Sequence, residues 1–253
     1  METHLLKKGD FFLEVEETGG NIVNFAHLFE SNHIFFPRMK RRDGKIRGGS
    51  HICFPYFGSI PGLEEKHGFG RHVMPGSVQN GTPDKLDLFF EKFSLHFEMI
   101  ENGFKQRLVC ESPQDFQYFN PAFHPYIFLP KIMGTEKREA EIIFHSPETG
   151  LNSVSSDIVS EKPFLQTGIK GSDISVKIKD HGEMIMRFDS SVNLSENKYM
   201  FQYDLCLWRD DPFFICVEPV LMASSKREAD YRFVSEFWME MEVDFFPEKN
   251  IPA

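Results

Sequence analysis

The residues near the C-terminus alternate between apolar and polar side chains with a period of two. Every odd position from 231 to 245 except Ser235 carries an apolar side chain, and most of the even positions are charged. Successive side chains of a β-strand point to opposite faces of the sheet. The pattern therefore predicts a long antiparallel strand with one face in a core and the other in solvent.

The same alternation recurs in two hairpins. The first covers residues 93–111 with a turn at 101–103, and the second covers 174–188 with a turn at 180–182. Both turns end in glycine, which tolerates the backbone conformations that tight hairpins need. Helical periodicity is scarce, and the best candidate is a short piece around 223–230. The chain is predicted to be all-β, with two large antiparallel sheets packed as a β-sandwich.

The first third of the chain gives weaker signals. Short strands are expected at 11–16 and 21–29, separated by Gly19-Gly20, and Asp43-Gly44 marks a hairpin turn. Basic residues flank this turn, which is more typical of solvated turn charge than of a binding surface. Residues 58–85 are rich in Gly, Pro and His and are expected to form a long irregular loop.

Length and composition agree with a single sandwich domain over residues 1–253. All-β domains of this size commonly remain undivided, and no linker-like segment interrupts the chain. Phenylalanine is unusually frequent, with 28 residues against 2 Trp. This suits strands and a sandwich core. The alternative that Phe simply replaces Leu as core filler stays open.

Charge and targeting signals limit the partners. The net charge of −10 argues against nucleic acid or an anionic membrane as the main partner. The first residues lack a signal-peptide pattern, and no apolar run is long enough to span a bilayer, so a soluble cytoplasmic protein is expected. The sequence gives no indication of oligomeric state.

Cysteine and motif patterns point away from cofactors. The four cysteines show no Cys-x-x-Cys spacing and sit beside apolar residues, as reduced core cysteines do. The histidines show no metal-ligand spacing. Nucleotide-binding loops and hydrolase elbows are absent too, so neither a metal nor a cofactor is expected.

Two neighbouring segments have the composition of a ligand site. Residues 46–58 read Ile-Arg-Gly-Gly-Ser-His-Ile-Cys-Phe-Pro-Tyr-Phe-Gly, and residues 67–71 read His-Gly-Phe-Gly-Arg. Together they gather arginines, histidines, glycines and aromatic side chains. This composition suits a site that holds a polar ligand against an aromatic surface.

Two titratable residues further along the chain have unusual surroundings. Glu218 shares a strand face with Phe214 and Cys216, and a carboxylate there is costly to bury unless it is paired or used. The bland alternative is a strand-end Glu that reaches solvent. His124 lies between Phe123 and Pro125, where a core histidine satisfied by the backbone is the alternative.

These segments resemble, in order, the motifs of the aldose 1-epimerase (mutarotase) superfamily. The matching pieces are the two segments above, the Phe119–Tyr126 stretch that ends in His-Pro-Tyr, and the Cys-Val-Glu-Pro of 216–219. The similarity is closest to the hexose-6-phosphate 1-epimerase branch. The resemblance implies a galactose mutarotase-like sandwich that acts on a small sugar or sugar phosphate without metal or cofactor.

The resemblance also implies residue roles. Glu218 would be the general base and His124 the general acid of sugar-ring opening, and His67 would bind the sugar or polarise its ring oxygen. Arg47 and Arg71 match arginines that face the substrate in the phosphosugar branch, where two guanidiniums can grip a phosphate. The alternative is that each arginine pairs with one of the many acidic residues.

Some positions depart from the family pattern. His51 stands where the family usually has Pro, and Val73 stands where the phosphosugar enzymes tend to have an aromatic residue. Residues 207–213 look more like general aldose epimerases. The family's sugar-binding acid between the histidine and the glutamate has two candidates here, Asp157 and Asp173.

Two other functions stay open. A non-catalytic carbohydrate-binding sandwich would keep the groove, although binding alone does not require both an acid and a base. A polysaccharide lyase or hydrolase is weaker, because hydrolysis by the usual route needs a second carboxylate that the sequence does not identify.

Overall fold

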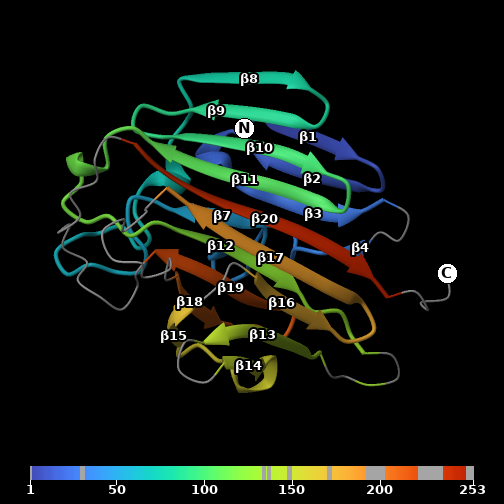
Figure 1. Cartoon of the computed structure of the whole chain (residues 1–253). Coiled ribbons are helices and arrows are strands. Elements are labelled where there is room, and N and C mark those ends of the chain that lie inside the picture. The colour runs from blue at the N-terminus through green and yellow to red at the C-terminus, as the bar shows by residue number, and fades with distance from the viewer. Residues whose placement is uncertain are drawn as a thin grey trace.

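The computed structural model describes residues 2–28, 32–132, 135, 138–146, 150–169, 173–191, 203–221 and 236–248. In this part of the chain two antiparallel nine-stranded sheets pack face to face (Figure 1). The predicted all-β sandwich is therefore confirmed. Its only helices in the described ranges are single 3₁₀ turns: η1 Thr18–Gly20, η2 Gly70–His72, η3 Pro113–Asp115 and η4 Ser156–Ile158.

The first sheet has the order β1-β2-β3-β7-β12-β19-β18-β15, and β4 pairs with β3. Its strands are β1 Thr3–Lys8, β2 Phe11–Glu16, β3 Ile22–His27, β4 Asn32–His33, β7 Ser50–Cys53, β12 Ala122–Phe128, β15 Phe164–Ile169, β18 Tyr203–Trp208 and β19 Phe214–Leu221.

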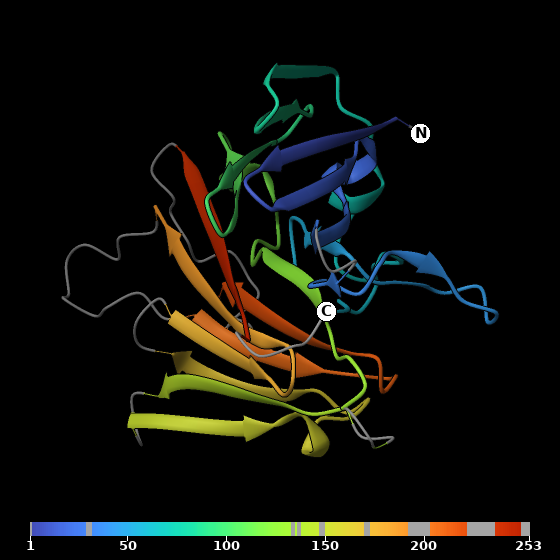
Figure 2. The same cartoon turned by 90° about the vertical axis from the view of Figure 1, so that its right-hand side faces the viewer.

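The second sheet has the order β14-β13-β16-β17-β20-β11-β10-β9-β8. Its strands are β8 Ser77–Thr82, β9 Lys85–Phe89, β10 Ser94–Ile100, β11 Gly103–Cys110, β13 Ala140–Ser146, β14 Gly150–Ser155, β16 Asp173–Ile178, β17 Gly182–Ser190 and β20 Phe237–Pro247. A separate small hairpin joins β5 Met39–Lys40 to β6 Ile46–Arg47 and stands out from the side of the molecule in Figure 2.

The segments with the clearest apolar–polar alternation form strands in the structure. β20 alternates buried and less buried residues as predicted, although the expected extension back to residue 231 and the expected helix at 223–230 lie outside the described residues. Both predicted hairpins form, as β10–β11 and β16–β17. The long loop expected at 58–85 is wrong in part, because residues 77–82 form the edge strand β8. Its side chains are almost all exposed, so no apolar alternation marks it.

Phenylalanine fills the space between the sheets. Among the described residues, eleven of the twelve largest fully buried side chains are Phe. Phe25 of β3 lies 4.9 Å from Phe104 of β11, and Phe119 lies 4.9 Å from Phe237 of β20, measured between ring centroids. These edge-to-face pairs join the two layers.

The middle of the first sheet is buried on both faces. Every residue of β19 and all but the last residue of β12 are buried. One face packs on the second sheet, and the other carries two smaller buried clusters, one around Cys53 and Val220 and one around Tyr126 and Phe214. No helix in the described part of the chain has the length and apolar character needed to cross a membrane.

Candidate functional site

One row of side chains crosses four strands of the first sheet, on the face turned away from the core. His51 of β7 pairs with His124 of β12, and Cys206 of β18 pairs with Glu218 of β19. The β12–β19 register puts His124 opposite Glu218, because their neighbours Tyr126 and Cys216 pair directly. Figure 1 shows these four strands side by side.

Strand alternation places Glu218 and His124 on this outer face. Ile215 and Val217 belong to the core between the sheets, and so do Phe123 and Ile127. The intervening side chains must then point the other way. Glu218 therefore shares the outer face with Cys216, two positions away, as the sequence predicts.

A cavity of about 940 Å³ opens over this row. His124 and Glu218 lie in its lining with His51 and Cys206. The walls come from the β5–β6 hairpin, the loop before η2, β15 and the start of the segment that follows β18. This volume is ample for a monosaccharide.

His124 and Glu218 approach each other without completing a hydrogen bond. Nε2 of His124 lies 3.4 Å from Oε2 of Glu218, and the side chains are only 6% and 2% exposed. Neither Nδ1 of His124 nor Oε2 of Glu218 has a hydrogen-bond partner in the described structure. Buried polar atoms are nearly always satisfied, so atoms left open beside a cavity point to a ligand.

Burial sets the protonation of this pair. It raises the pKa of Glu218 to about 8, an effect that the charge of Lys66 partly offsets. Burial, and to a smaller extent His67 and Arg71, lowers the pKa of His124 well below its usual range. At neutral pH the two side chains therefore share a single proton, held mainly by the carboxyl group.

His67 is held by a two-way clamp with Gly58. Its backbone N–H donates to the Gly58 carbonyl at 2.8 Å, and its ring Nδ1 accepts from the Gly58 N–H at 3.1 Å. Burial, followed by Lys66 and Arg71, lowers the pKa of His67 to about 3. The ring is therefore neutral and carries its proton on Nε2.

Glycines adjust the backbone around the site. Gly49 and Gly68 both have positive φ, and a Cβ on either would collide with backbone atoms of Ile22 or Phe54. These glycines of the two sequence segments are required by chain packing. They let β7 and the His67 loop lie against the rest of the sheet.

His51 and Tyr126 enclose the ring of His124. His51 stacks on it at 4.4 Å between centroids, and Tyr126 stacks on the ring at 4.9 Å. The sequence predicts a site role for neither residue. It marks His51 only as a departure from Pro, because the pairing of β7 with β12 cannot be predicted from the local sequence.

The two candidate arginines are engaged differently from one another. Arg47 donates from Nε at 3.1 Å and Nη2 at 2.8 Å to the same carboxylate oxygen of Asp210. Its guanidinium also lies 5.1 Å from the ring centroid of Trp208. For Arg47 the structure thus shows an acidic partner, the alternative left open by the sequence.

Arg71 is held by neutral partners instead. Its Nη2 donates to the carbonyl of Lys66 at 2.9 Å, and its Nε donates to His72 at 3.0 Å. A third nitrogen, Nη1, lies 3.4 Å from Nε2 of His51. The positive charge of Arg71 has no carboxylate partner in the described structure, and Lys66 beside it also forms no ion pair there.

The two aspartates considered as sugar ligands lie elsewhere. Asp157 is exposed in η4, and Asp173 is exposed at the start of β16 near Arg187. Neither lines the cavity, where the acidic residues are Glu161, Asp210 and Glu218.

The four cysteines are free and buried, as the sequence predicted. Two groups among the described residues could hold a metal ion. One is His124, Cys216 and Glu218, and the other is the more exposed Glu2, His4 and Glu17.

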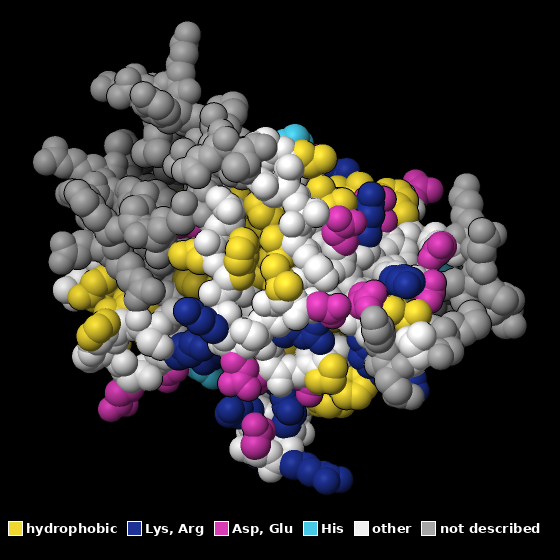
Figure 3. Space-filling model, turned by 90° about the horizontal axis from the view of Figure 1, so that it is seen from below, with side chains coloured by type: hydrophobic (Ala, Val, Ile, Leu, Met, Phe, Trp, Pro, Cys, Tyr) yellow, Lys and Arg dark blue, Asp and Glu magenta, His cyan; other side chains and the backbone are white. Residues whose placement is uncertain are grey.

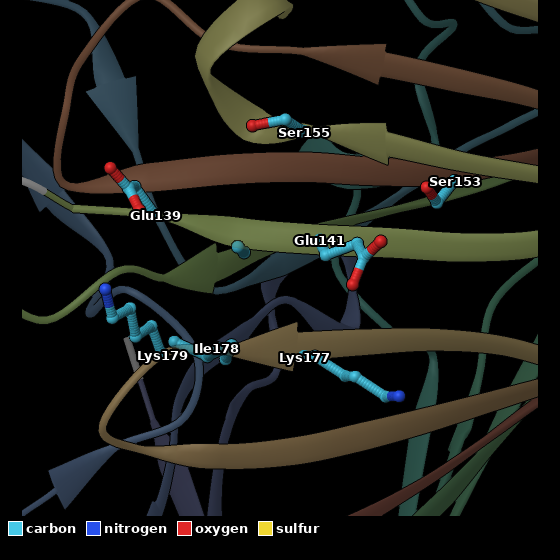
Figure 4. A pocket seen from close by; sticks show the side chains of 8 residues that line it. Glu139, Glu141, Ser153, Ser155, Lys177, Ile178 and Lys179 are labelled. Carbon is cyan, nitrogen blue, oxygen red and sulfur yellow. The ribbon is translucent and has the colours of Figure 1, made fainter.

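A second hollow, of about 410 Å³, lies over β13, β14 and β16. Figure 4 shows Glu141 and Lys177 there on adjacent strands, with the serines of β14 nearby. Acidic and basic side chains also mix over the face seen in Figure 3. Such solvated, mixed charge is ordinary protein surface, so the cavity over Glu218 is the candidate site.

Comparisons with known proteins agree with the fold. No family model and no curated protein matches the sequence. A galactose mutarotase related enzyme from Lactobacillus acidophilus is similar with a TM-score of 0.67 and 11% identity, over 97% of both chains. A galactose mutarotase-like protein from Lactobacillus casei has a TM-score of 0.66 and 10% identity, over 97% of this chain and 100% of that one.

A third structure, provisionally assigned as an aldose 1-epimerase from Escherichia coli K12, has a TM-score of 0.62 and 14% identity. The match covers 97% of this chain and 99% of that chain. At these identities the similarity establishes the architecture alone. The chain has a galactose mutarotase-like β-sandwich fold, and its neighbours do not distinguish the hexose-6-phosphate branch.

Proposed function

We propose that this protein is an aldose 1-epimerase that interconverts the α and β anomers of a hexose or hexose 6-phosphate. One observation carries the proposal: buried His124 and Glu218 face each other below a sugar-sized cavity, with open polar atoms. The fold shared with mutarotase-like proteins supports the same reaction class. That support is by analogy, because one fold can host several functions.

Anomer exchange requires one proton to leave the C1 hydroxyl and another to reach the ring oxygen. Ionised Glu218 takes the hydroxyl proton while protonated His124 donates to the ring oxygen, and the C1–O5 bond breaks. After rotation about C1–C2, the O5 hydroxyl attacks the other carbonyl face. His124 then takes back the O5 proton, and Glu218 returns its proton to O1.

The shared proton makes this arrangement accessible. In the free protein burial favours the proton on Glu218, whereas the proposed base must be ionised. Transfer across the 3.4 Å contact to His124 gives a carboxylate and an imidazolium without changing the total charge. Binding of a sugar with donors to the carboxylate favours this form.

Neutral His67 would add a hydrogen bond to the sugar. Its Nδ1 is already occupied by Gly58, so Nε2–H is the donor that remains for a sugar oxygen. His67 lines the cavity, and its ring lies 5.3 Å from that of His124. This suits a role beside the ring oxygen.

For a phosphosugar, Arg71 and Lys66 would meet the phosphate. Both line the cavity, and neither charge is neutralised by a carboxylate in the described structure. Arg47 would contribute less than the sequence suggested, because Asp210 already accepts from two of its nitrogens.

Magnetisation-transfer NMR on glucose, galactose and glucose 6-phosphate tests the proposal. Purified protein should accelerate exchange between the anomers of at least one of them, and Glu218→Gln protein should not. Sugar binding without acceleration in the folded wild type would contradict the enzyme and favour a carbohydrate-binding protein.

A further inference from the structure

A thiol completes a three-residue cluster at the base of the cavity. His124, Cys216 and Glu218 each offer one ligand atom, and all three atoms lie within 4.8 Å of one another. All three residues are buried. Epimerisation as proposed uses the imidazole and the carboxylate and gives Cys216 no role.

The three side chains are zinc ligands of different types. Zn²⁺ is bound by Cys sulfur at about 2.3 Å and by His nitrogen or carboxylate oxygen at about 2.0–2.2 Å, usually in a tetrahedron. Ligand atoms around one such ion are therefore roughly 3.3–3.8 Å apart. The 3.4 Å contact between His124 and Glu218 already fits, and small side-chain rotations would bring in the sulfur.

A second observation also points to a ligand here. Oε2 of Glu218 and Nδ1 of His124 are buried with no hydrogen-bond partner. A metal ion bound at Oε2 would satisfy that oxygen. The cavity borders His124 and Glu218, so it leaves room for the water that completes a three-ligand zinc site.

We propose that His124, Cys216 and Glu218 form a Zn²⁺ site in the base of the cavity. The zinc–sulfur bond forms as the thiol proton leaves to the buffer, and the proton that His124 and Glu218 share leaves to the buffer as the ion binds both side chains. Bound zinc occupies the carboxylate and the imidazole that the proposed epimerase needs, so it inhibits that reaction. The inhibition rests on the proposed function, whereas the binding does not.

Zinc titration of chelator-treated, desalted protein tests the binding directly. A competing chromophoric zinc indicator should report one tight site per chain, weakened at least tenfold by Cys216→Ser. Cys206→Ser is the matched control, because Cys206 is another buried thiol, pairs with Glu218 across the sheet and lies outside the cluster. Cys206→Ser protein should bind zinc as the wild type does.

Cobalt gives a readout that a structural effect of the substitution would not imitate. Co²⁺ bound by Cys216 should show thiolate-to-cobalt charge-transfer absorption in the wild type and Cys206→Ser proteins. The band should vanish in Cys216→Ser and in Cys216→Ala, each checked for folding by circular dichroism. Wild-type zinc affinity in a folded Cys216 variant would overturn the site and place the ion elsewhere, for example at Glu2, His4 and Glu17.

Anomer exchange separates this proposal from the proposed function. If the protein is an epimerase, stoichiometric zinc should abolish exchange in the wild type and leave most of it in Cys216→Ser protein. Zinc binding with the cobalt signature in a protein without exchange activity would sustain the metal site and reject the enzyme. Exchange that zinc-saturated wild-type protein retains would overturn the inhibition.

Discussion

Two pairs, each of one basic and one acidic side chain, line the same cavity, and they differ in how completely their polar atoms are satisfied. Arg47 and Asp210 form a forked pair with contacts of 2.8 and 3.1 Å, and Arg41 lies 3.4 Å from the same carboxylate. His124 and Glu218 touch at 3.4 Å and leave polar atoms without partners.

The first pair has the features of polar groups that stabilise the fold, and the second has those of polar groups that bind a ligand. In a hydrogen-bonded ion pair the two side chains satisfy each other's charge and hydrogen bonds. Such a pair holds together the segments that carry it, here the β5–β6 hairpin and the segment after β18. Unsatisfied buried groups lower stability by an amount that a ligand can recover. We therefore expect the two pairs to respond oppositely to substitution.

The largest expected effect is on catalysis. Glu218→Gln keeps the shape of the side chain but removes the base, so the rate of anomer exchange should fall roughly a thousandfold. NMR exchange rates at saturating sugar would measure it. Asp210→Asn, which alters the satisfied pair in the same cavity, should leave most of the rate. A similar loss in both variants would erase the contrast.

The same substitution should raise stability at alkaline pH. The pKa of Glu218 is raised to about 8 in the folded protein, so the folded state retains a proton that the unfolded state releases above its own lower pKa. Stability therefore falls as pH rises from about 5 to 8, by at most roughly 1.4 kcal/mol per pH unit. Glu218→Gln protein lacks this loss.

Thermal unfolding in chelator-containing buffer at pH 5, 6.5 and 8 would test the sign. The difference in melting temperature, Glu218→Gln protein minus wild type, should increase by a few degrees from pH 5 to pH 8. A gap that stays constant would mean that the buried carboxyl keeps an ordinary pKa.

The sequence predicts the features of the site that depend only on neighbouring residues in the chain. Alternation in 213–220 puts Glu218 on the face opposite Ile215 and Val217, and the structure agrees. The hairpins and β20 are equally predictable, because a half-buried strand has an apolar side chain at every second residue. The sequence does not predict β8, because an edge strand with exposed side chains lacks that alternation.

Long-range pairings could not be read in the same way. Arg47 and Asp210 are 163 positions apart, and nothing near either residue identifies the other. His51 stacks on His124 only because β7 and β12 are neighbours in the sheet, and Cys216 joins Glu218 and His124 for the same kind of reason. Sheet order, set by the whole sandwich, decides these contacts.

Breaking the satisfied pair should cost moderate stability. Arg47→Ala and Asp210→Ala should each lower the free energy of unfolding by about 2 kcal/mol. Asp210→Ala removes the carboxylate partner of Arg47, and Arg47→Ala leaves the Asp210 carboxylate only its 3.4 Å contact with Arg41. The double variant should cost less than the sum of the two. Chemical denaturation would measure this, with Lys45→Ala, an exposed change in the same hairpin, as the control. Strict additivity would show that the pair contributes no coupling.

The smallest expected effect concerns a phosphate on the substrate. Lys66 is exposed and has no ion pair in the described structure, whereas Asp210 already pairs with Arg47. Lys66→Ala should therefore raise the Michaelis constant for glucose 6-phosphate about fivefold, or ~1 kcal/mol, and change that for glucose little.

Lys45→Ala is the matched control for that measurement, because Lys45 also lines the cavity but lies 3.8 Å from Asp43. Arg47→Ala should change the Michaelis constants for the two sugars alike, because it removes a guanidinium that is already paired with a carboxylate. A penalty specific to the phosphosugar in Arg47→Ala, larger than in Lys66→Ala, would reverse the assignment. The forked pair with Asp210 would then have to open when the substrate binds, and Arg47 would belong with the unsatisfied groups of the cavity.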